Sequence, residues 1–201
     1  MPPIETGFMA LILWGLVGYF FGSIPFGIVI TRVFGLGDLR QIGSGNIGTT
    51  NVLRTGSKPA AAATLILDGG KGAIAVLVAR WLANEDAAQI AGLLAFLGHC
   101  FPIWLKFKGG KGVATFLGLM LALAWPVGIA CCLTWLATAL LGRISSLSAL
   151  VAASSSTFWI LILGFGQTFI LGIAVTLLVF WRHKENIARL SAGTEPKIGK
   201  K

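Results

Sequence analysis

The chain has 201 residues, of which 56% are hydrophobic and 11% are charged, and its formal net charge is +9. Soluble domains carry about 25% charged residues, so this composition and a mean hydropathy of +0.85 exclude an ordinary water-soluble domain. Its aromatic residues lie inside apolar runs rather than among basic residues, which excludes nucleic acid as the expected partner. We interpret residues 1–201 as a single integral membrane domain.

Seven apolar runs follow one another along the chain, separated by breaks that carry turn-forming or charged residues. They cover residues 8–31, 59–83, 88–107, 113–125, 127–142, 144–163 and 168–182. This pattern predicts an all-α, polytopic protein with seven transmembrane helices. The first run is interpreted as a retained span, because no positive charge precedes it and no convincing cleavage site follows it. The run 113–125 is short for a span at about 1.5 Å per residue, so tilt or local thinning must accommodate it.

The distribution of basic residues predicts the orientation of these spans. With seven spans, one side has only Arg80, beside Glu85 and Asp86, while Lys71 lies within a run. The positive-inside rule then places the basic side in the cytoplasm, with the N-terminus outside and the C-terminus inside. An even number of spans would divide these charges between both sides. The basic side collects Arg32, Arg40, Arg54, Lys58, Lys106, Lys108, Lys111, Arg143, Arg182, Lys184, Arg189, Lys197, Lys200 and Lys201.

Two charged residues interrupt the second apolar run, in the stretch Asp68-Gly69-Gly70-Lys71-Gly72. A charge at the bilayer centre costs on the order of 3 kcal/mol, so these groups must pair, face a wet cavity or lie near an interface. Asp68 and Lys71 are three residues apart and share a helix face. Two interpretations stay open, a structural ion pair and a wall of a polar cavity. Gly-Gly-Lys-Gly recurs at 109–112, but the flanking sequences do not align, so an internal repeat is not favoured.

The first polar segment, residues 43–54, combines three glycines with hydroxyl and amide side chains and ends at Arg54. Glycines let a backbone approach a ligand and adopt positive φ, and successive free amides form an anion-binding nest. Arg54 can hold a phosphate in bidentate fashion. We therefore interpret the segment as a phosphate-binding loop rather than an ordinary connector.

The second polar segment runs from Gly98-His99-Cys100 to the tract Lys108-Gly109-Gly110-Lys111-Gly112, which leads directly into an apolar helix. Free N–H groups and the positive end of the helix dipole suit a phosphate there. The tract is not a Walker A loop, because Gly112 stands where that motif needs Ser or Thr. The alternative is a basic anchor at the membrane surface.

The third polar segment, residues 181–190, continues from the last span. His183 and Asn186 are three apart and would share a helix face, and Arg182, Asn186 and Arg189 roughly share another. The alternative is a solvated basic terminus. Together the three segments predict a site that holds phosphate groups beside lipid. Its candidate phosphate-binding residues are Gly43, Gly45, Asn46, Thr50, Asn51, Lys108, Gly109, Gly110, Gly112 and Arg182.

No metal or cofactor is expected from the pattern of potential ligands. The sequence has no His-x-x-His or Cys-x-x-Cys cluster. Its three cysteines, Cys100, Cys131 and Cys132, lie in or beside apolar segments without metal-ligand spacing and are interpreted as small apolar residues.

At residues 43–54, 98–115 and 182–195, and at Gly22-Ser23-Ile24-Pro25-Phe26-Gly27, the sequence resembles the PlsY-type glycerol-3-phosphate acyltransferase family of bacteria. The resemblance runs along nearly the whole chain, including Gly193-Thr194-Glu195. Thr49, where alanine is common, is a minor departure. The family's functional positions fall on Ser44, Arg54, Lys111, His183 and Asn186, for which the resemblance implies catalytic roles.

The resemblance also implies an activity, a location and partners. Members have seven spans in the bacterial cytoplasmic (inner) membrane. They transfer a fatty acyl group from acyl phosphate to the 1-hydroxyl of glycerol 3-phosphate, which yields lysophosphatidic acid and phosphate in the first step of phospholipid synthesis. Besides these substrates and membrane lipid, a candidate partner is the peripheral enzyme that makes acyl phosphate.

The general base stays open at this stage, between His183 and a phosphate oxygen of a substrate. Neither His99 nor His183 belongs to the His-x-x-x-x-Asp motif of acyl-CoA-dependent glycerolipid acyltransferases. A transporter or channel for an organic phosphate is the first alternative function, but it predicts two related halves. A CDP-alcohol phosphotransferase is the second, and it needs several aspartates to hold metal.

Overall fold

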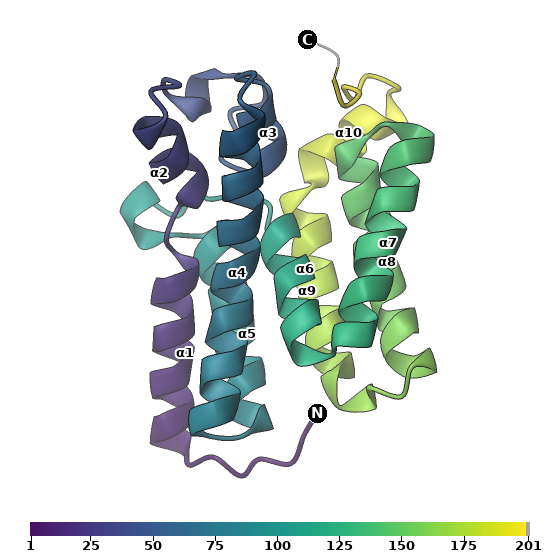
Figure 1. Cartoon of the computed structure of the whole chain (residues 1–201). Coiled ribbons are helices and arrows are strands. Elements are labelled where there is room, and N and C mark those ends of the chain that lie inside the picture. Colours follow the sequence, from purple (N-terminus) through teal and green to yellow (C-terminus); the bar gives the residue numbers. More distant parts are fainter. Residues whose placement is uncertain (200–201) are drawn as a thin grey trace.

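The computed structural model describes residues 1–199, which form helices joined by turns and loops and contain no β-strand. Helix α6 (Val113–Leu123) contacts α4 (Lys58–Leu82) on one side and α7 (Trp125–Gly142) on the other. It joins a group made of α1 (Phe8–Gly22), α4 and α5 (Glu85–Cys100) to a group made of α7, α8 (Ser145–Ile162) and α9 (Phe169–Arg182) (Figure 1). The all-helical expectation is confirmed for these residues.

The first apolar run is broken, although the sequence predicted one continuous span over 8–31. Helix α1 ends at Gly22, and α2 (Phe26–Val33) begins after Pro25, which has no N–H to continue a helical ladder. Two side chains supply the donors that the broken backbone lacks. The Trp104 indole donates to Ser23 O at 2.6 Å, and Lys71 Nζ donates to Ile24 O at 2.7 Å.

The two Gly-Gly-Lys-Gly tetrads have different structures. The first lies inside α4, where Gly118 allows α6 to approach so closely that a Cβ on it would lie 2.1 Å from Gly69 O. The second is the loop before α6. This difference explains why the flanking sequences do not align.

Five helical segments of the described residues are long and apolar enough to cross a membrane: Phe8–Val33, Lys58–Leu82, Glu85–Leu105, Trp125–Gly142 and Ser145–Ile162. The pair Gly166–Arg182 and Lys184–Ser191 makes a sixth if its 63° bend lies within one span. Helix α6 is the shorter apolar segment, as the sequence indicated. Residues 1–199 thus contain five to six candidate membrane spans, and seven stays a proposal.

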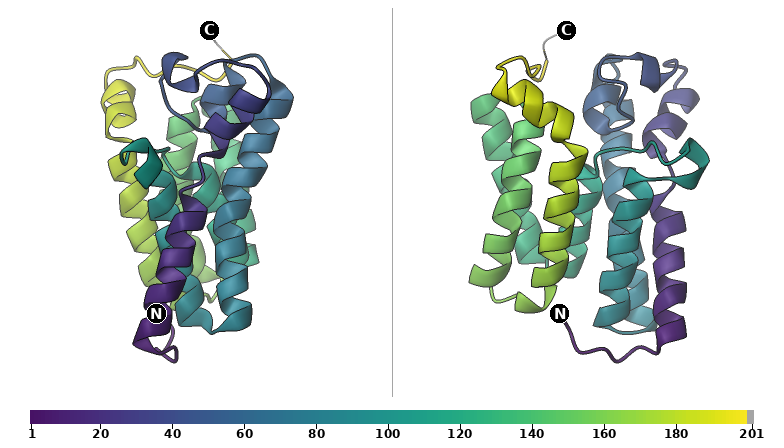
Figure 2. Two further views of the ribbon diagram at one scale, coloured as in Figure 1. Left: turned by 90° about the vertical axis from the view of Figure 1, so that its left-hand side faces the viewer. Right: turned by 180° about the vertical axis from the view of Figure 1, so that it is seen from behind.

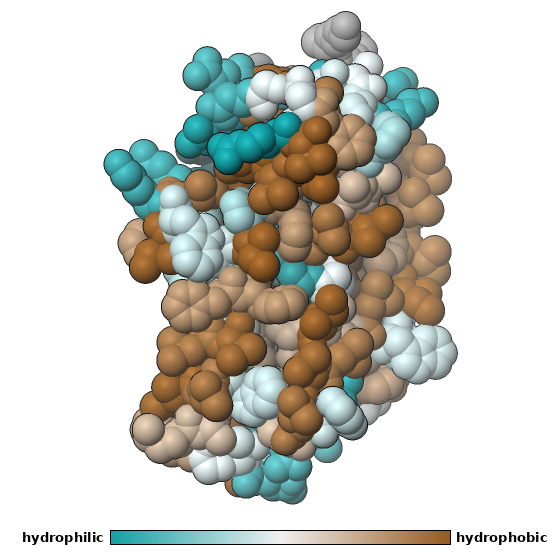
Figure 3. Space-filling view, turned by 60° about the vertical axis from the view of Figure 1, so that its left-hand side comes forward, coloured by the Kyte–Doolittle hydropathy of each residue, from teal (hydrophilic) through white to brown (hydrophobic). Residues whose placement is uncertain are grey.

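The surface has the polarity of a membrane protein. Figure 3 shows a hydrophobic band with hydrophilic residues gathered mainly at one end of the molecule. Large apolar side chains such as Trp81 and Leu141 are 81% and 89% exposed. Residues 1–7 and the helix α10 (Lys184–Ser191) lie at opposite ends of the bundle in Figure 1. Lys200 and Lys201, counted with the basic side, lie outside the described residues.

Candidate active site

The first polar segment folds around Asn51. It follows the short helix η1 (Leu39–Gln41) and contains the short helix α3 (Thr49–Leu53), and between the two helices Gly43 and Gly45 have φ of 53° and 68°. Asn51 Nδ2 donates to Leu39 O and Ile42 O, both at 2.9 Å, and its Oδ1 accepts from the Ser44 N–H at 3.3 Å. Because both polar atoms of the Asn51 amide already have partners in this segment, the structural role of Asn51 is to shape the loop.

Arg54 lies across this loop. Its Nη1 donates to Asn51 Oδ1 at 3.3 Å, and a Cβ on Gly43 would lie 2.6 Å from Nη1. Only glycine therefore lets the guanidinium approach the backbone here. Ser44 is exposed and Asn46 is half-buried, and Thr50 Oγ1 is 3.0 Å from Ser145 Oγ at the start of α8. The result is a cationic loop that contacts α8.

The second polar segment forms a loop fixed along both edges. The N–H groups of Gly109 and Gly110 donate to Cys100 O and His99 O, each at 3.1 Å. From the other edge, Arg182 donates through Nε to Gly110 O at 3.1 Å and through Nη2 to Gly109 O at 3.0 Å. Lys108 is exposed at the start of the loop. Gly112, at φ 82°, precedes the first turn of α6.

Arg182 does not share a face with Asn186 and Arg189, contrary to the sequence-based expectation. The chain bends by 63° between Arg182 and Lys184, so Arg182 ends α9 while the other two lie on α10 (Figure 2). Its guanidinium also lies 5.2 Å from the centre of the Phe101 ring. These contacts hold the second loop against α9.

The second and third segments meet directly at Lys111 and Asn186. Lys111 Nζ donates to Asn186 Oδ1, and Asn186 Nδ2 donates to Glu195 Oε1. Burial lowers the pKa of Lys111, and the charge of Arg189 lowers it further. The half-buried ammonium therefore faces a site where an incoming anion would be favourable.

Glu195 joins the third segment to α8 and is the main site-supporting residue that the site prediction left out. It accepts from Ser146 Oγ at 2.6 Å and, through Oε2, from Arg189 Nε at 2.6 Å. Burial raises the pKa of Glu195, but the bonds from Ser146, Asn186 and Arg189 lower it more, so its pKa lies below the usual value. The carboxylate fixes the orientation of the Asn186 amide and turns Oδ1 toward Lys111. Glu195 was visible in the family pattern, whereas nothing in the sequence marked Ser146.

His183 is buried at the bend, with 2% of its surface exposed. Its Nδ1 lies 2.8 Å from Val179 O, and because a carbonyl only accepts, Nδ1 carries the proton. Burial lowers the pKa of His183 to about 4, so the ring is neutral near pH 7. In that tautomer Nε2 is free of a proton and can accept a hydrogen bond.

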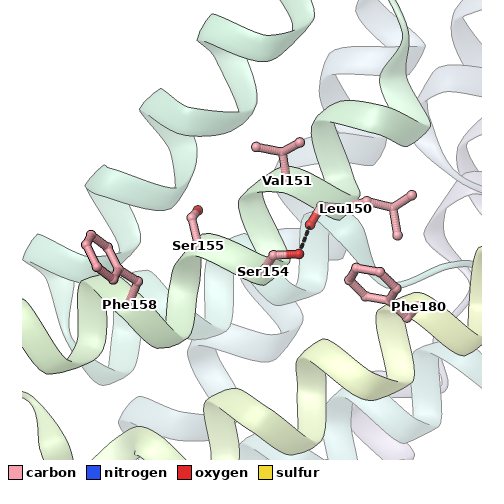
Figure 4. Close-up of a pocket in the computed structure, with 6 residues that line it drawn as sticks. All are labelled: Leu150, Val151, Ser154, Ser155, Phe158 and Phe180. Atoms are coloured by element: carbon pink, nitrogen blue, oxygen red, sulfur yellow. Dashed lines mark hydrogen bonds between the residues drawn. The ribbon is translucent and has the colours of Figure 1, made fainter.

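An apolar hollow of about 510 Å³ opens between α8 and α9 on the outer surface (Figure 4). Ser154 Oγ donates to Leu150 O at 2.8 Å, as Figure 4 shows, so this hydroxyl is satisfied within its own helix. Leu150 and Phe180 line the hollow about one helical turn from Ser146 and His183. A long apolar group beside the polar site could therefore lie there.

The predicted residues thus fall into two connected groups. The first is the loop with Ser44 and Arg54, and the second joins Lys111, His183 and Asn186 with Arg182 behind them. Contacts of Thr50 and Glu195 with the start of α8 link the two groups. Two neighbouring cationic, donor-rich groups can hold two anions side by side.

A model of the glycerol-3-phosphate acyltransferase family matches residues 12–193. A protein named glycerol-3-phosphate acyltransferase from Ruegeria pomeroyi is 71% identical over 201 residues, which cover 100% of this chain and 99% of that protein. One of the same name from Cereibacter sphaeroides is 69% identical over 201 residues, covering 100% and 96%. The crystal structure of PlsY (YgiH), an integral membrane glycerol 3-phosphate acyltransferase, in its glycerol 3-phosphate form has a TM-score of 0.88 and 37% identity, covering 94% of this chain and 96% of that chain. The lysophosphatidic acid form has a TM-score of 0.87 and 36% identity, covering 94% and 95%.

Proposed function

The chain belongs to the glycerol-3-phosphate acyltransferase family, and on that premise we propose that it transfers a fatty acyl group from acyl phosphate to the 1-hydroxyl of glycerol 3-phosphate. The hydroxyl oxygen bonds to the acyl carbon, the bond from that carbon to the phosphate oxygen breaks, and inorganic phosphate leaves with the hydroxyl proton. The products are lysophosphatidic acid and phosphate. Phosphate is a fair leaving group, so the reaction needs no covalent enzyme intermediate.

The observation that carries this proposal is the pair of adjoining cationic groups, one for each phosphate-bearing substrate. We assign glycerol 3-phosphate to the group with Lys111, His183 and Asn186, and acyl phosphate to the loop with Ser44 and Arg54. Holding both substrates in line supplies much of the rate acceleration. Donors of the first loop, such as the Ser44 hydroxyl, would stabilise charge on the carbonyl oxygen and the departing phosphate.

His183 is proposed to position glycerol 3-phosphate as a hydrogen-bond acceptor. Its Nδ1–H is directed to Val179 O, so the unprotonated Nε2 is the nitrogen available to the substrate. The proton then has two possible destinations, Nε2 itself or a phosphate oxygen held by the neighbouring cations. We favour the phosphate oxygen, because burial keeps the pKa of His183 at about 4 and makes it a weak base.

The membrane arrangement follows from the same proposal. Helix α6 and helix α9, which covers most of the apolar run 168–182, would complete seven spans, with the N-terminus outside and the C-terminus in the cytoplasm. Residues 1–201 then form one acyltransferase domain in the bacterial cytoplasmic membrane. The acyl tail would lie along the hollow between α8 and α9 while its phosphate enters the basic end (Figure 4).

A reconstitution experiment separates this function from the alternative, transport of an organic phosphate. Purified protein in lipid vesicles is given labelled glycerol 3-phosphate with or without acyl phosphate. We expect lysophosphatidic acid and phosphate in equal amounts only with acyl phosphate, and no uptake without it. Uptake of glycerol 3-phosphate without acyl transfer would refute the proposal in favour of a transporter.

A further inference from the structure

Three ionisable side chains lie buried between α4 and α5, outside the residues assigned to the substrates. Lys71 Nζ lies 2.8 Å from Asp68 Oδ1, and His99 Nδ1 lies 3.6 Å from the same oxygen. Each side chain is at most 4% exposed. Apolar residues of similar size are often as stabilising as a buried ion pair. The cluster therefore calls for a role besides stability.

His99 and Asp68 face each other through polar atoms that have few alternatives. Asp68 Oδ1 and His99 Nδ1 are both buried; Oδ1 is paired with the Lys71 ammonium, and Nδ1 has no hydrogen-bond partner among residues 1–199. Their separation of 3.6 Å is too long for a hydrogen bond but within the range of an electrostatic pair. The carboxylate is thus the polar group that orients this edge of the imidazole.

The other edge of the His99 ring is in contact with the second loop. A Cβ on Gly110 would lie 2.2 Å from His99 Nε2 and 2.8 Å from Cε1, so the Gly110 backbone packs directly on the ring. The Gly110 N–H also donates to His99 O at 3.1 Å. Gly110 immediately precedes Lys111, so the position of the ring determines where the Lys111 backbone begins.

Asp68 also contacts the far end of the same loop. Thr115, in the first turn of α6, donates its hydroxyl to Asp68 O at 2.9 Å. Lys71, which balances the Asp68 charge, donates to Ile24 O at 2.7 Å and ties this part of α4 to the break before α2. The loop is therefore supported at its start through His99 and at its end through the Asp68 backbone.

We propose that Asp68, acting through His99, is a positioning residue for the loop Gly109–Gly112. The carboxylate orients the imidazole, the imidazole fixes the Gly110 backbone, and that backbone directs Lys111 toward Asn186. The inference rests on the proposed function, in which this loop binds the phosphate of glycerol 3-phosphate. Asp68 and His99 together therefore set the affinity for glycerol 3-phosphate and leave the acyl phosphate site unchanged.

The test uses His99→Asn, which retains an amide toward Asp68 but lacks the ring edge that contacts Gly110. With acyl phosphate saturating, the KM for glycerol 3-phosphate should rise about tenfold, the effect of weakening one charge-assisted contact. The kcat and the KM for acyl phosphate should change by less than about threefold, since the first loop is untouched. An unchanged KM for glycerol 3-phosphate, with or without a lower Tm, would overturn the proposal.

Compensation provides the decisive second measurement. Gly110→Ala should raise the KM for glycerol 3-phosphate, because its methyl group meets the His99 ring. In His99→Asn the ring is gone, so adding Gly110→Ala should raise the KM by a smaller factor than Gly110→Ala does in the wild type. Penalties that multiply in the double variant would show that ring and loop act independently, and would refute the proposal.

Asp68 is tested without leaving an unpaired charge, by Asp68→Asn combined with Lys71→Met. This double variant should fold and reproduce the KM change of His99→Asn, and a normal KM would overturn the part assigned to Asp68. The matched control is Asp86→Asn at the other end of α5, where the carboxylate accepts from the Thr6 N–H at 2.8 Å. It should lower Tm without changing KM. A wild type that transfers no acyl group would refute the proposed function, whereas an active wild type with normal variants would refute this inference alone.

Discussion

Replacing Lys111 by methionine removes the ammonium while keeping most of the side-chain length. In the structure its Nζ makes one bond, to Asn186 Oδ1, and the half-buried position leaves two N–H donors for a phosphate. One charge-assisted hydrogen bond contributes about 1.5–3 kcal/mol. The kcat/KM for glycerol 3-phosphate should therefore fall roughly 10- to 150-fold in Lys111→Met.

The assay is release of inorganic phosphate over a range of glycerol 3-phosphate concentrations, with acyl phosphate saturating. Lys106→Gln is the control, because Lys106 carries the same charge five positions earlier but is exposed and outside the assigned site. It should leave kcat/KM unchanged. A Lys111→Met protein that folds and retains the wild-type kcat/KM would refute the phosphate-binding role of Lys111.

Three further predictions concern Arg54, His183 and the membrane topology. Arg54→Ala should lose roughly 10- to 100-fold in activity, and Arg54→Lys should not restore it if the contact is bidentate; full activity in Arg54→Lys would contradict that geometry. If His183 were the base, activity would fall as pH drops toward its lowered pKa of about 4, and His183→Gln would lose kcat without a change in KM. We expect instead that His183→Gln mainly raises the KM for glycerol 3-phosphate, and a thousandfold loss of kcat at constant KM would make His183 the base. Reporters placed before Pro2 and after Lys201 should lie outside the cell and in the cytoplasm, and finding both on one side would exclude seven spans.

The helical architecture could be predicted from composition, because a chain surrounded by lipid must satisfy its backbone groups internally. The break at residues 23–25 could also have been predicted, since Pro25 interrupts the first run. Hydropathy alone, however, predicts one continuous span there. The bend at His183 could not be predicted from the sequence, because no Gly or Pro precedes it. At this bend the Arg182 side chain donates to Gly110 O in the second loop, which is a contact between distant parts of the sequence.

The candidate site could be predicted only as a set of segments. Glycine content and donors identified the loops around Arg54 and Lys111, because those features are local. The contact of Ser146 with Glu195 could not be predicted, since the two residues are 49 positions apart and nothing local marks Ser146. The pairing of Asp68 and Lys71 followed from helix spacing, whereas the proximity of His99 to Asp68 required the packing of α5 on α4.

The proposed function depends on acyl phosphate being the acyl donor for glycerol 3-phosphate. The most direct measurement compares initial rates of the purified protein with glycerol 3-phosphate and either acyl phosphate or acyl-CoA of the same chain, each with and without EDTA. We expect rapid formation of lysophosphatidic acid from acyl phosphate, unaffected by EDTA, and almost none from acyl-CoA. Comparable rates with acyl-CoA, or complete loss of activity with EDTA, would contradict it.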